Sequence, residues 1–123
     1  MLPFEHRWVM APMVAQSDLP FRLLCRLHGT QVCYTEMLES WTFAADPKYR
    51  EAAMASCSIT VGGVEIVDRP LVVQFAANDP AVLLEAALHA QALGADAVDI
   101  NFGCPQRRAS EGHYGAAPAR NSQ

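Results

Sequence analysis

The stretch with the clearest chemical content is residues 99–106, which read Asp-Ile-Asn-Phe-Gly-Cys-Pro-Gln. If they end a buried strand, its apolar residues face one side and Asp99 and Asn101 the other. Burying two polar side chains without partners costs on the order of a few kcal/mol each, so the pair needs a reason. The glycine and proline around Cys104 favour a tight turn that holds a thiol at the mouth of a pocket. The alternative that this segment alone leaves open is an ordinary strand end with a buried structural cysteine.

The elements that must position this stretch alternate between strand and helix. Strands are expected at residues 7–13, 31–37, 70–76 and 97–101, and helices over residues 18–28, somewhere between 39 and 55, and over 80–93. Asp79 followed by Pro80 is a helix-start signal, because Asp caps the first turn and proline fits the first helical position. Gly62-Gly63 between β-branched residues predicts a short hairpin over residues 59–67.

The first helix is expected to begin after Ser17, a good N-cap residue. Its leucines are expected to form one apolar side: Leu19, Leu23, Leu24 and Leu27. Arg22 and Arg26 would share another side of the helix. This pattern predicts a leucine face turned to the core.

The repeated order of strand and helix predicts the α/β class. Residues 71–100 have the length of one βαβ crossover, and their strands are nearly continuous apolar runs, as in a parallel sheet covered by helices. A doubly wound sheet and part of a (β/α)₈ barrel both fit. No Gly-x-Gly-x-x-Gly follows a strand, and polar residues such as Gln74 and Asn101 lie at strand ends, which favours the barrel. About four of eight strands are present, so we expect a partial barrel with two open sheet edges and an uncovered inner face.

Composition and charge exclude several classes of protein. The chain has 123 residues, 51% apolar and 18% charged, which is typical of a globular domain. No apolar run is as long as a membrane span, and the charged residues near Met1 argue against a secretion signal. Four cysteines with separations that fit neither a zinc site nor Cys-x-x-Cys predict reduced thiols and no metal. The net charge of −4 offers no broad surface to a polyanion. We therefore expect a cytoplasmic protein, with the nucleus as the alternative compartment.

Five segments, in order and spacing, resemble the tRNA-dihydrouridine synthases over roughly residues 9–116. They are Ala11-Pro12-Met13 with Ser17-Asp18-Leu19-Pro20-Phe21-Arg22, then Tyr34-Thr35-Glu36-Met37, then Val73-Gln74-Phe75 with Asn78-Asp79-Pro80, then residues 99–106, then Gly112-His113-Tyr114-Gly115-Ala116. The Asn-x-Gly-Cys-Pro-Gln block is the most specific, and the variant looks closest to eukaryotic relatives that modify the D-loop region. The resemblance implies that residues 1–116 are the N-terminal part of an FMN-binding (β/α)₈ barrel. Residues 117–123 depart from the family pattern and are expected to be an off-pattern tail.

The resemblance also implies roles for individual residues. Pro12 and Met13 would lie against the flavin ring, and Gln74 would hydrogen-bond its polar edge. Asn101 would sit beside the flavin and the target uracil. Cys104 would be the catalytic acid, because hydride transfer from reduced FMN to C6 of uracil leaves an anion that needs a proton at C5. NADPH would reduce the FMN.

The substrate implied by the resemblance is tRNA, whose uridine must be unstacked to enter the pocket. Arg107 and Arg108 would either meet tRNA phosphates or lie on a solvated surface. His113 and Tyr114, in the loop that follows the cysteine, would either touch the substrate or be solvated. The remaining polar candidates, Asp99 and Glu36, are expected to be structural, with the Asp99 carboxylate accepting from neighbouring backbone N–H groups. Cys25 and Cys33 are expected in the core.

Two alternatives remain open from the sequence. One is a truncated isoform that binds no flavin and is inactive, which the missing half of the barrel suggests. The other is a different flavin-dependent pyrimidine oxidoreductase, such as a dihydroorotate or dihydropyrimidine dehydrogenase domain. The latter explains the strand-end chemistry but not the Gly-Cys-Pro-Gln spacing. The sequence predicts no oligomeric state.

Overall fold

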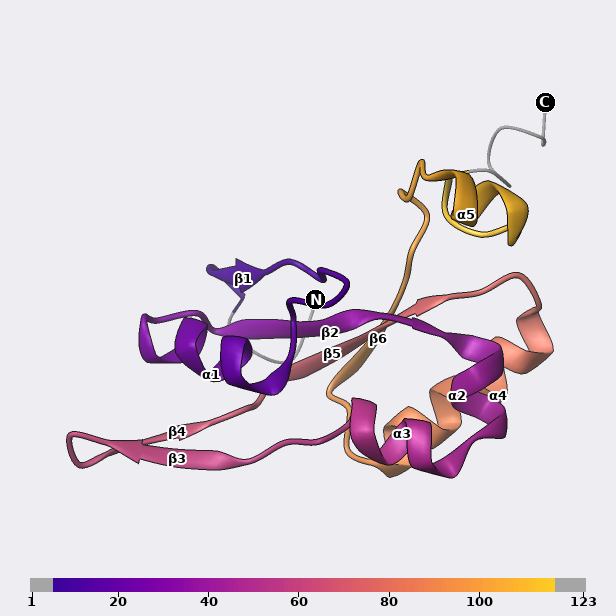
Figure 1. Cartoon of the computed structure of the whole chain (residues 1–123). Helices are drawn as coiled ribbons and strands as arrows, with labels where there is room; N and C mark the ends of the chain where they lie inside the picture. Colours follow the sequence, from indigo (N-terminus) through magenta and orange to yellow (C-terminus); the bar gives the residue numbers. More distant parts are fainter. Residues whose placement is uncertain (1–5, 117–123) are drawn as a thin grey trace.

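A four-stranded parallel sheet organises the chain, which is described here by a computed structural model over residues 6–116 (Figure 1). The strands lie in the order β1-β2-β5-β6, with bounds Val9–Met10, Val32–Glu39, Leu71–Ala76 and Ala97–Ile100. All three pairings are parallel, and helices occupy each connection between neighbouring strands. The predicted α/β class is therefore confirmed. The predicted tail, residues 117–123, lies outside the described residues.

Helices form in the three predicted regions, and a short helix that was not predicted follows the loop that carries Cys104. They are α1 (Leu19–Leu27), α2 (Ser40–Ala45), α3 (Pro47–Ala53), α4 (Pro80–Ala92) and α5 (Arg107–Glu111). Asp79 caps α4 as predicted, its side chain accepting from two backbone N–H groups. At α1, however, the cap is Asp18 and not Ser17. The Ser17 hydroxyl instead accepts from the N–H of Met13 and donates to the carbonyl of Ala11, so it closes the turn after β1.

The region between β2 and β5 holds two short helices and a hairpin. Asp46 ends α2 and caps α3, so the Asp-Pro pair is a break between two helices. β3 (Ser58–Val61) and β4 (Val64–Val67) pair antiparallel across Gly62 and Gly63, which confirms the predicted hairpin. Both glycines have positive φ, +58° and +80°, as the tight two-residue turn requires. Figure 1 shows this hairpin as an arm that extends away from the sheet.

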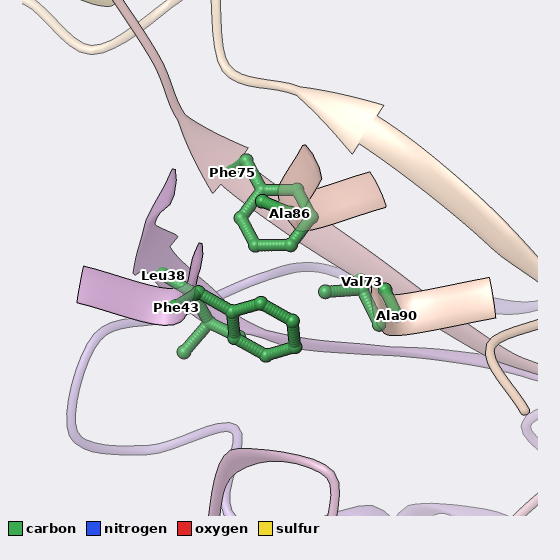
Figure 2. Packing of buried hydrophobic residues seen from close by; sticks show 6 residues of the cluster. All are labelled: Leu38, Phe43, Val73, Phe75, Ala86 and Ala90. Atoms are coloured by element: carbon green, nitrogen blue, oxygen red, sulfur yellow. The ribbon is translucent and has the colours of Figure 1, made fainter. Parts of the chain in front are cut away.

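The main core lies between the sheet and the helices α2 and α4 (Figure 2). Phe43 of α2 meets Phe75 of β5 edge to face, with ring centroids 5.0 Å apart. Ala86 and Ala90 bring α4 close to the same face of β5. Because side chains alternate along a strand, this packing leaves Gln74 on the opposite face.

The last strand of the sheet differs from its prediction as a buried strand. Val98 and Ile100 of β6 are 38% and 36% exposed. Within residues 6–116, β6 pairs with β5 alone, so its apolar side chains have a neighbouring strand on one side only. No helix in the same range is both long and apolar enough to cross a lipid bilayer.

The buried face of α1 carries two arginines beside Leu23, so the predicted leucine side is buried only in part. Leu24 and Leu27 are 51% and 42% exposed, whereas Arg22 and Arg26 are buried. Both arginines turn inward because their guanidinium groups flank Asp68, whose carboxylate is fully buried between β4 and β5. A buried carboxylate is tolerated only with such partners.

The ion cluster of Arg22, Arg26 and Asp68 has close geometry. Nε and Nη2 of Arg22 lie 2.9 Å and 2.8 Å from one carboxylate oxygen, and Nε of Arg26 lies 2.9 Å from the other. The remaining N–H groups donate to backbone carbonyls of Ser17, Gln31, Ala55, Arg69 and Pro70. The cluster thus joins α1 to the segments that enter β2 and β5.

Replacing the central carboxylate, that of Asp68, should make the chain less stable. Asp68→Ala leaves two guanidinium groups buried without their counter-charge, so we expect the free energy of unfolding to fall by about 3–5 kcal/mol. Urea denaturation followed by circular dichroism measures the loss.

A matched control breaks an exposed ion pair, that of Arg107 and Glu111, whose atoms lie 3.0 Å apart. Glu111→Gln should cost less than about 1 kcal/mol, since exposed pairs contribute little. If the two variants lost equal stability, the structural importance of the buried cluster would be contradicted.

Candidate functional site

A cleft of about 520 Å³ opens at the carboxyl ends of the parallel strands. Four of the residues with a predicted cofactor or catalytic role line it: Pro12 after β1, Gln74 in β5, and Asn101 and Cys104 after β6. Met13 is outside the lining; its backbone forms the turn that Ser17 closes. The cleft thus brings together residues that are up to 92 positions apart, because parallel strands align their carboxyl ends at one edge of the sheet.

A chain of polar side chains runs across the floor of this cleft. Nε2 of Gln74 donates to Oδ2 of Asp99 at 2.7 Å. Nδ2 of Asn101 lies 3.3 Å from Oε1 of Gln74 and 3.1 Å from the sulfur of Met37. The Asp99 carboxylate therefore accepts from a side-chain amide, and the prediction that it accepts from neighbouring backbone N–H groups is wrong.

The backbone of Cys104 is held on both sides. Oδ1 of Asn101 accepts from the N–H groups of Gly103 and Cys104, each at 2.9 Å. The carbonyl of Cys104 accepts from the N–H of Ala116 at 3.1 Å. These bonds fix the loop that presents the thiol, whose residue is partly buried at the edge of the cleft.

The close approach of Gly115 to this loop explains its residue type. Gly115 has φ +67°, and a Cβ built on it would lie 2.7 Å from the carbonyl oxygen of Cys104. Only glycine adopts this conformation without strain and leaves room for the carbonyl. The segment after α5 is therefore shaped to the cysteine loop.

Comparison with known proteins decides the family. The family model for dihydrouridine synthases matches residues 9–123, which is most of the chain. The chain belongs to the dihydrouridine synthase family. The match includes the segment expected to depart from the family pattern, residues 117–123.

Curated proteins named tRNA-dihydrouridine synthases are similar over nearly the whole chain. A tRNA-dihydrouridine(16/17) synthase-like protein of Mus musculus is 52% identical over 110 residues, 89% of this chain and 22% of the mouse protein. The tRNA-dihydrouridine(16/17) synthase of Saccharomyces cerevisiae is 49% identical over 108 residues, 88% of this chain and 24% of the yeast protein. tRNA-dihydrouridine synthase B of Pseudomonas aeruginosa is 35% identical over 116 residues, 94% of this chain and 32% of that protein. The chain therefore spans about a quarter of the length of the first two relatives.

The predicted substrate-binding residues of this family member lie in and after α5, in different environments. Arg107 is exposed and pairs with Glu111 one turn later, and Arg108 lies beside it in α5. His113 is exposed with φ +54°. Tyr114 is only 3% exposed, so most of its ring is used in packing, although it also lines a second pocket of about 310 Å³. Their roles as substrate contacts stay predictions.

Sequence reasoning gave no role to three residues that shape the site. Met37 of β2 lines the cleft, and its sulfur lies 3.1 Å from Nδ2 of Asn101. Trp41 packs against Tyr114, with ring centroids 6.1 Å apart. Gly115 supports the cysteine loop. The glycine at this position is the one sequence signal that could have pointed to its role, because glycine often marks a left-handed backbone or a close approach. Glu36, by contrast, is structural as expected, because its carboxylate accepts from the N–H of Ala15 at 2.8 Å.

The other cysteines have environments that separate them from Cys104. Cys33 is fully buried in β2, where burial raises the pKa of its thiol to about 11, as suits a core residue. Cys25 is partly buried and Cys57 is exposed. Within the described part of the chain, no three His, Cys, Asp or Glu side chains gather to hold a metal ion.

Adding one methyl group at Gly115 should disturb the cysteine loop. We expect Gly115→Ala to lower the free energy of unfolding by about 2–4 kcal/mol, from the left-handed backbone and from the contact with the Cys104 carbonyl together. Urea denaturation gives the loss.

Gly62→Ala is the matched control, because Gly62 has φ +58° and nothing within 4 Å of a built Cβ. It bears only the backbone strain, about 1–2 kcal/mol. Equal losses in the two variants would show that the approach to Cys104 is unimportant.

Proposed function

We propose that this chain forms the first four strand–helix units of an FMN-binding (β/α)₈ barrel in a tRNA-dihydrouridine synthase, where it supplies the proton donor of the reaction. The order of the four parallel strands supports the barrel, since, apart from the inserted β3-β4 hairpin, each strand neighbours the next one along the chain. The position of the cleft supports it too, because (β/α)₈ enzymes place their chemistry at the carboxyl ends of the strands. Family membership supports the reaction.

The cleft suits the ring end of a flavin. Its volume of about 520 Å³ is in the usual range for small-molecule sites, and its lining mixes apolar side chains with a few amides. Pro12 and Met37 offer apolar contact to a planar ring. The amide of Gln74 can donate once more from Nε2 and accept once more at Oε1, so it retains hydrogen-bonding capacity for the ring's polar edge.

The cleft does not suit the phosphate end of FMN. None of the described residues that line it is cationic. Phosphate groups are normally held by Arg, Lys or clustered backbone N–H groups. The phosphate of FMN would therefore be bound by residues other than those of this cleft.

The chemistry divides between the cofactor and the chain. Reduced FMN, when bound, supplies the hydride for C6 of uracil. The thiol of Cys104 would deliver the proton to C5, and Asn101 holds the backbone of that residue in place. Hydrogen bonds at both the N–H and the carbonyl of Cys104 hold the backbone from which the thiol projects.

The substrate would be a tRNA uridine and the reductant NADPH. The names of the similar mouse and yeast proteins specify tRNA and NAD(P)(+), which favours this reading over a small-molecule pyrimidine oxidoreductase. Arg107 and Arg108 lie on α5, directly after the cysteine loop, where they would meet phosphates beside an unstacked uridine. With a net charge of −4, the chain offers few other contacts to RNA.

Removing the thiol should abolish the modification. In cells whose gene carries Cys104→Ala, dihydrouridine in tRNA should fall by at least about 100-fold at the affected position, as expected for loss of a general acid. Mass spectrometry of digested tRNA measures it. Cys57→Ala removes an exposed thiol and should leave dihydrouridine unchanged. Unaltered dihydrouridine in the Cys104→Ala strain would overturn the proposed function.

The isolated chain should bind flavin weakly and without regard to its phosphate. Since none of the described residues of the cleft lining is cationic, we expect riboflavin and FMN to bind within about threefold of each other and more weakly than about 1 μM. Quenching of flavin fluorescence gives both dissociation constants. FMN binding at submicromolar concentration, or at least tenfold tighter than riboflavin, would contradict the assignment of this cleft to the ring alone.

A further inference from the structure

We propose that Asp99 is a positioning residue, which fixes the orientation of the Gln74 and Asn101 amides and through them the loop that carries Cys104. The inference rests on the proposed function, in which Cys104 is the proton donor. It concerns how the thiol is placed, a role that neither the family match nor the names of the relatives address.

One end of the polar chain can only accept hydrogen bonds. An ionised carboxylate has no proton to donate, so Gln74 must turn Nε2 toward Asp99, and it does so at 2.7 Å. This choice leaves Oε1 of Gln74 facing Asn101, whose Nδ2 lies 3.3 Å away. The carboxylate thus selects one of the two orientations of the Gln74 amide.

The other end of this row of hydrogen-bonded side chains meets groups that can only donate hydrogen bonds. The backbone N–H groups of Gly103 and Cys104 both point at Oδ1 of Asn101. This fixes Nδ2 of Asn101 toward Gln74 and the Met37 sulfur, in agreement with the orientation that Asp99 imposes. If Gln74 turned over, its Nε2 would face Nδ2 of Asn101, and two donors would meet. The row of hydrogen bonds from Asp99 to Cys104 therefore has a single consistent direction, set by an acceptor at one end and donors at the other.

Burial strengthens the hydrogen bonds that set this direction. Gln74 is buried and Asp99 partly so, and hydrogen bonds are stronger where water is excluded. Burial, and then the negative charge of Asp99, raise the pKa of Tyr34 on β2. The carboxylate therefore acts on groups of the inner face of the sheet, where the cleft lies.

The chain's cysteines provide a test that needs neither flavin nor tRNA. The alkylation rate of each thiol by iodoacetamide at neutral pH can be followed by mass spectrometry of peptides. The alkylation rate of Cys104 reports on opening of the loop, and that of buried Cys33 reports on global unfolding. The rate of exposed Cys57 reports on the activity of the reagent itself. A loosened loop should speed alkylation at Cys104 alone.

Three variants give the expected pattern. Asp99→Leu removes the acceptor, so the Cys104 rate should rise about fivefold, as for loss of one hydrogen bond in a local opening equilibrium, with Cys33 and Cys57 unchanged. Asp99→Asn keeps a side-chain oxygen that can accept from Gln74 and should restore the original rate. Gln74→Leu removes the next side chain in this row of hydrogen bonds and should raise the alkylation rate of Cys104 by a similar factor.

Asp96→Leu is the matched control, because Asp96 precedes the other end of β6 and binds Arg69 and the N–H of Leu71. It should not raise the Cys104 rate beyond any rise at Cys33. The proposal is overturned if Cys104 keeps its original rate in Asp99→Leu, whatever Gln74→Leu shows, or if its rate rises only in parallel with Cys33. Because the assay contains no flavin or tRNA, its result is independent of whether Cys104→Ala abolishes dihydrouridine.

Discussion

The buried carboxylate of Asp68 organises the amino-terminal side of the parallel sheet. It holds Arg22 and Arg26 inside the protein, and their remaining N–H groups satisfy backbone carbonyls where the chain enters β2 and β5. Three charges in a protein interior are stable only when every partner is present. The cluster therefore ties α1 to the segments that lead into β2 and β5. Gln74 of β5 then lies beside Asp99 in the parallel pairing with β6.

The two ends of the sheet are held by different kinds of interaction. The amino ends of the strands are tied by the ion cluster, which is closed and fully paired. The carboxyl ends are tied by neutral amides and one carboxylate, which leave hydrogen-bonding capacity unused beside the cleft. Barrel enzymes commonly separate stability and chemistry in this way. Here the separation follows the strand direction and needs no additional element.

Local signals predicted the secondary structure well and the packing less well. Asp79-Pro80 and Gly62-Gly63 act within a few residues, so the start of α4 and the hairpin could be predicted. The buried side of α1 could not, because the partner of Arg22 is 46 positions away and arginine is normally exposed. Val98 and Ile100 are apolar yet a third exposed, since burial depends on neighbouring elements and not on residue type alone.

The α/β class and the order of the sheet strands with the helices between them followed from sequence patterns alone, and the family followed from five motifs whose spacing is specific. The same motifs identified Cys104, Asn101 and Gln74 as candidates for one site. How these side chains meet is visible only in the folded chain: Asp99 accepts from Gln74, and Asn101 and Ala116 hold the Cys104 backbone. The reason is that motifs record which residues occur together, whereas the direction of a hydrogen bond depends on every donor and acceptor around it.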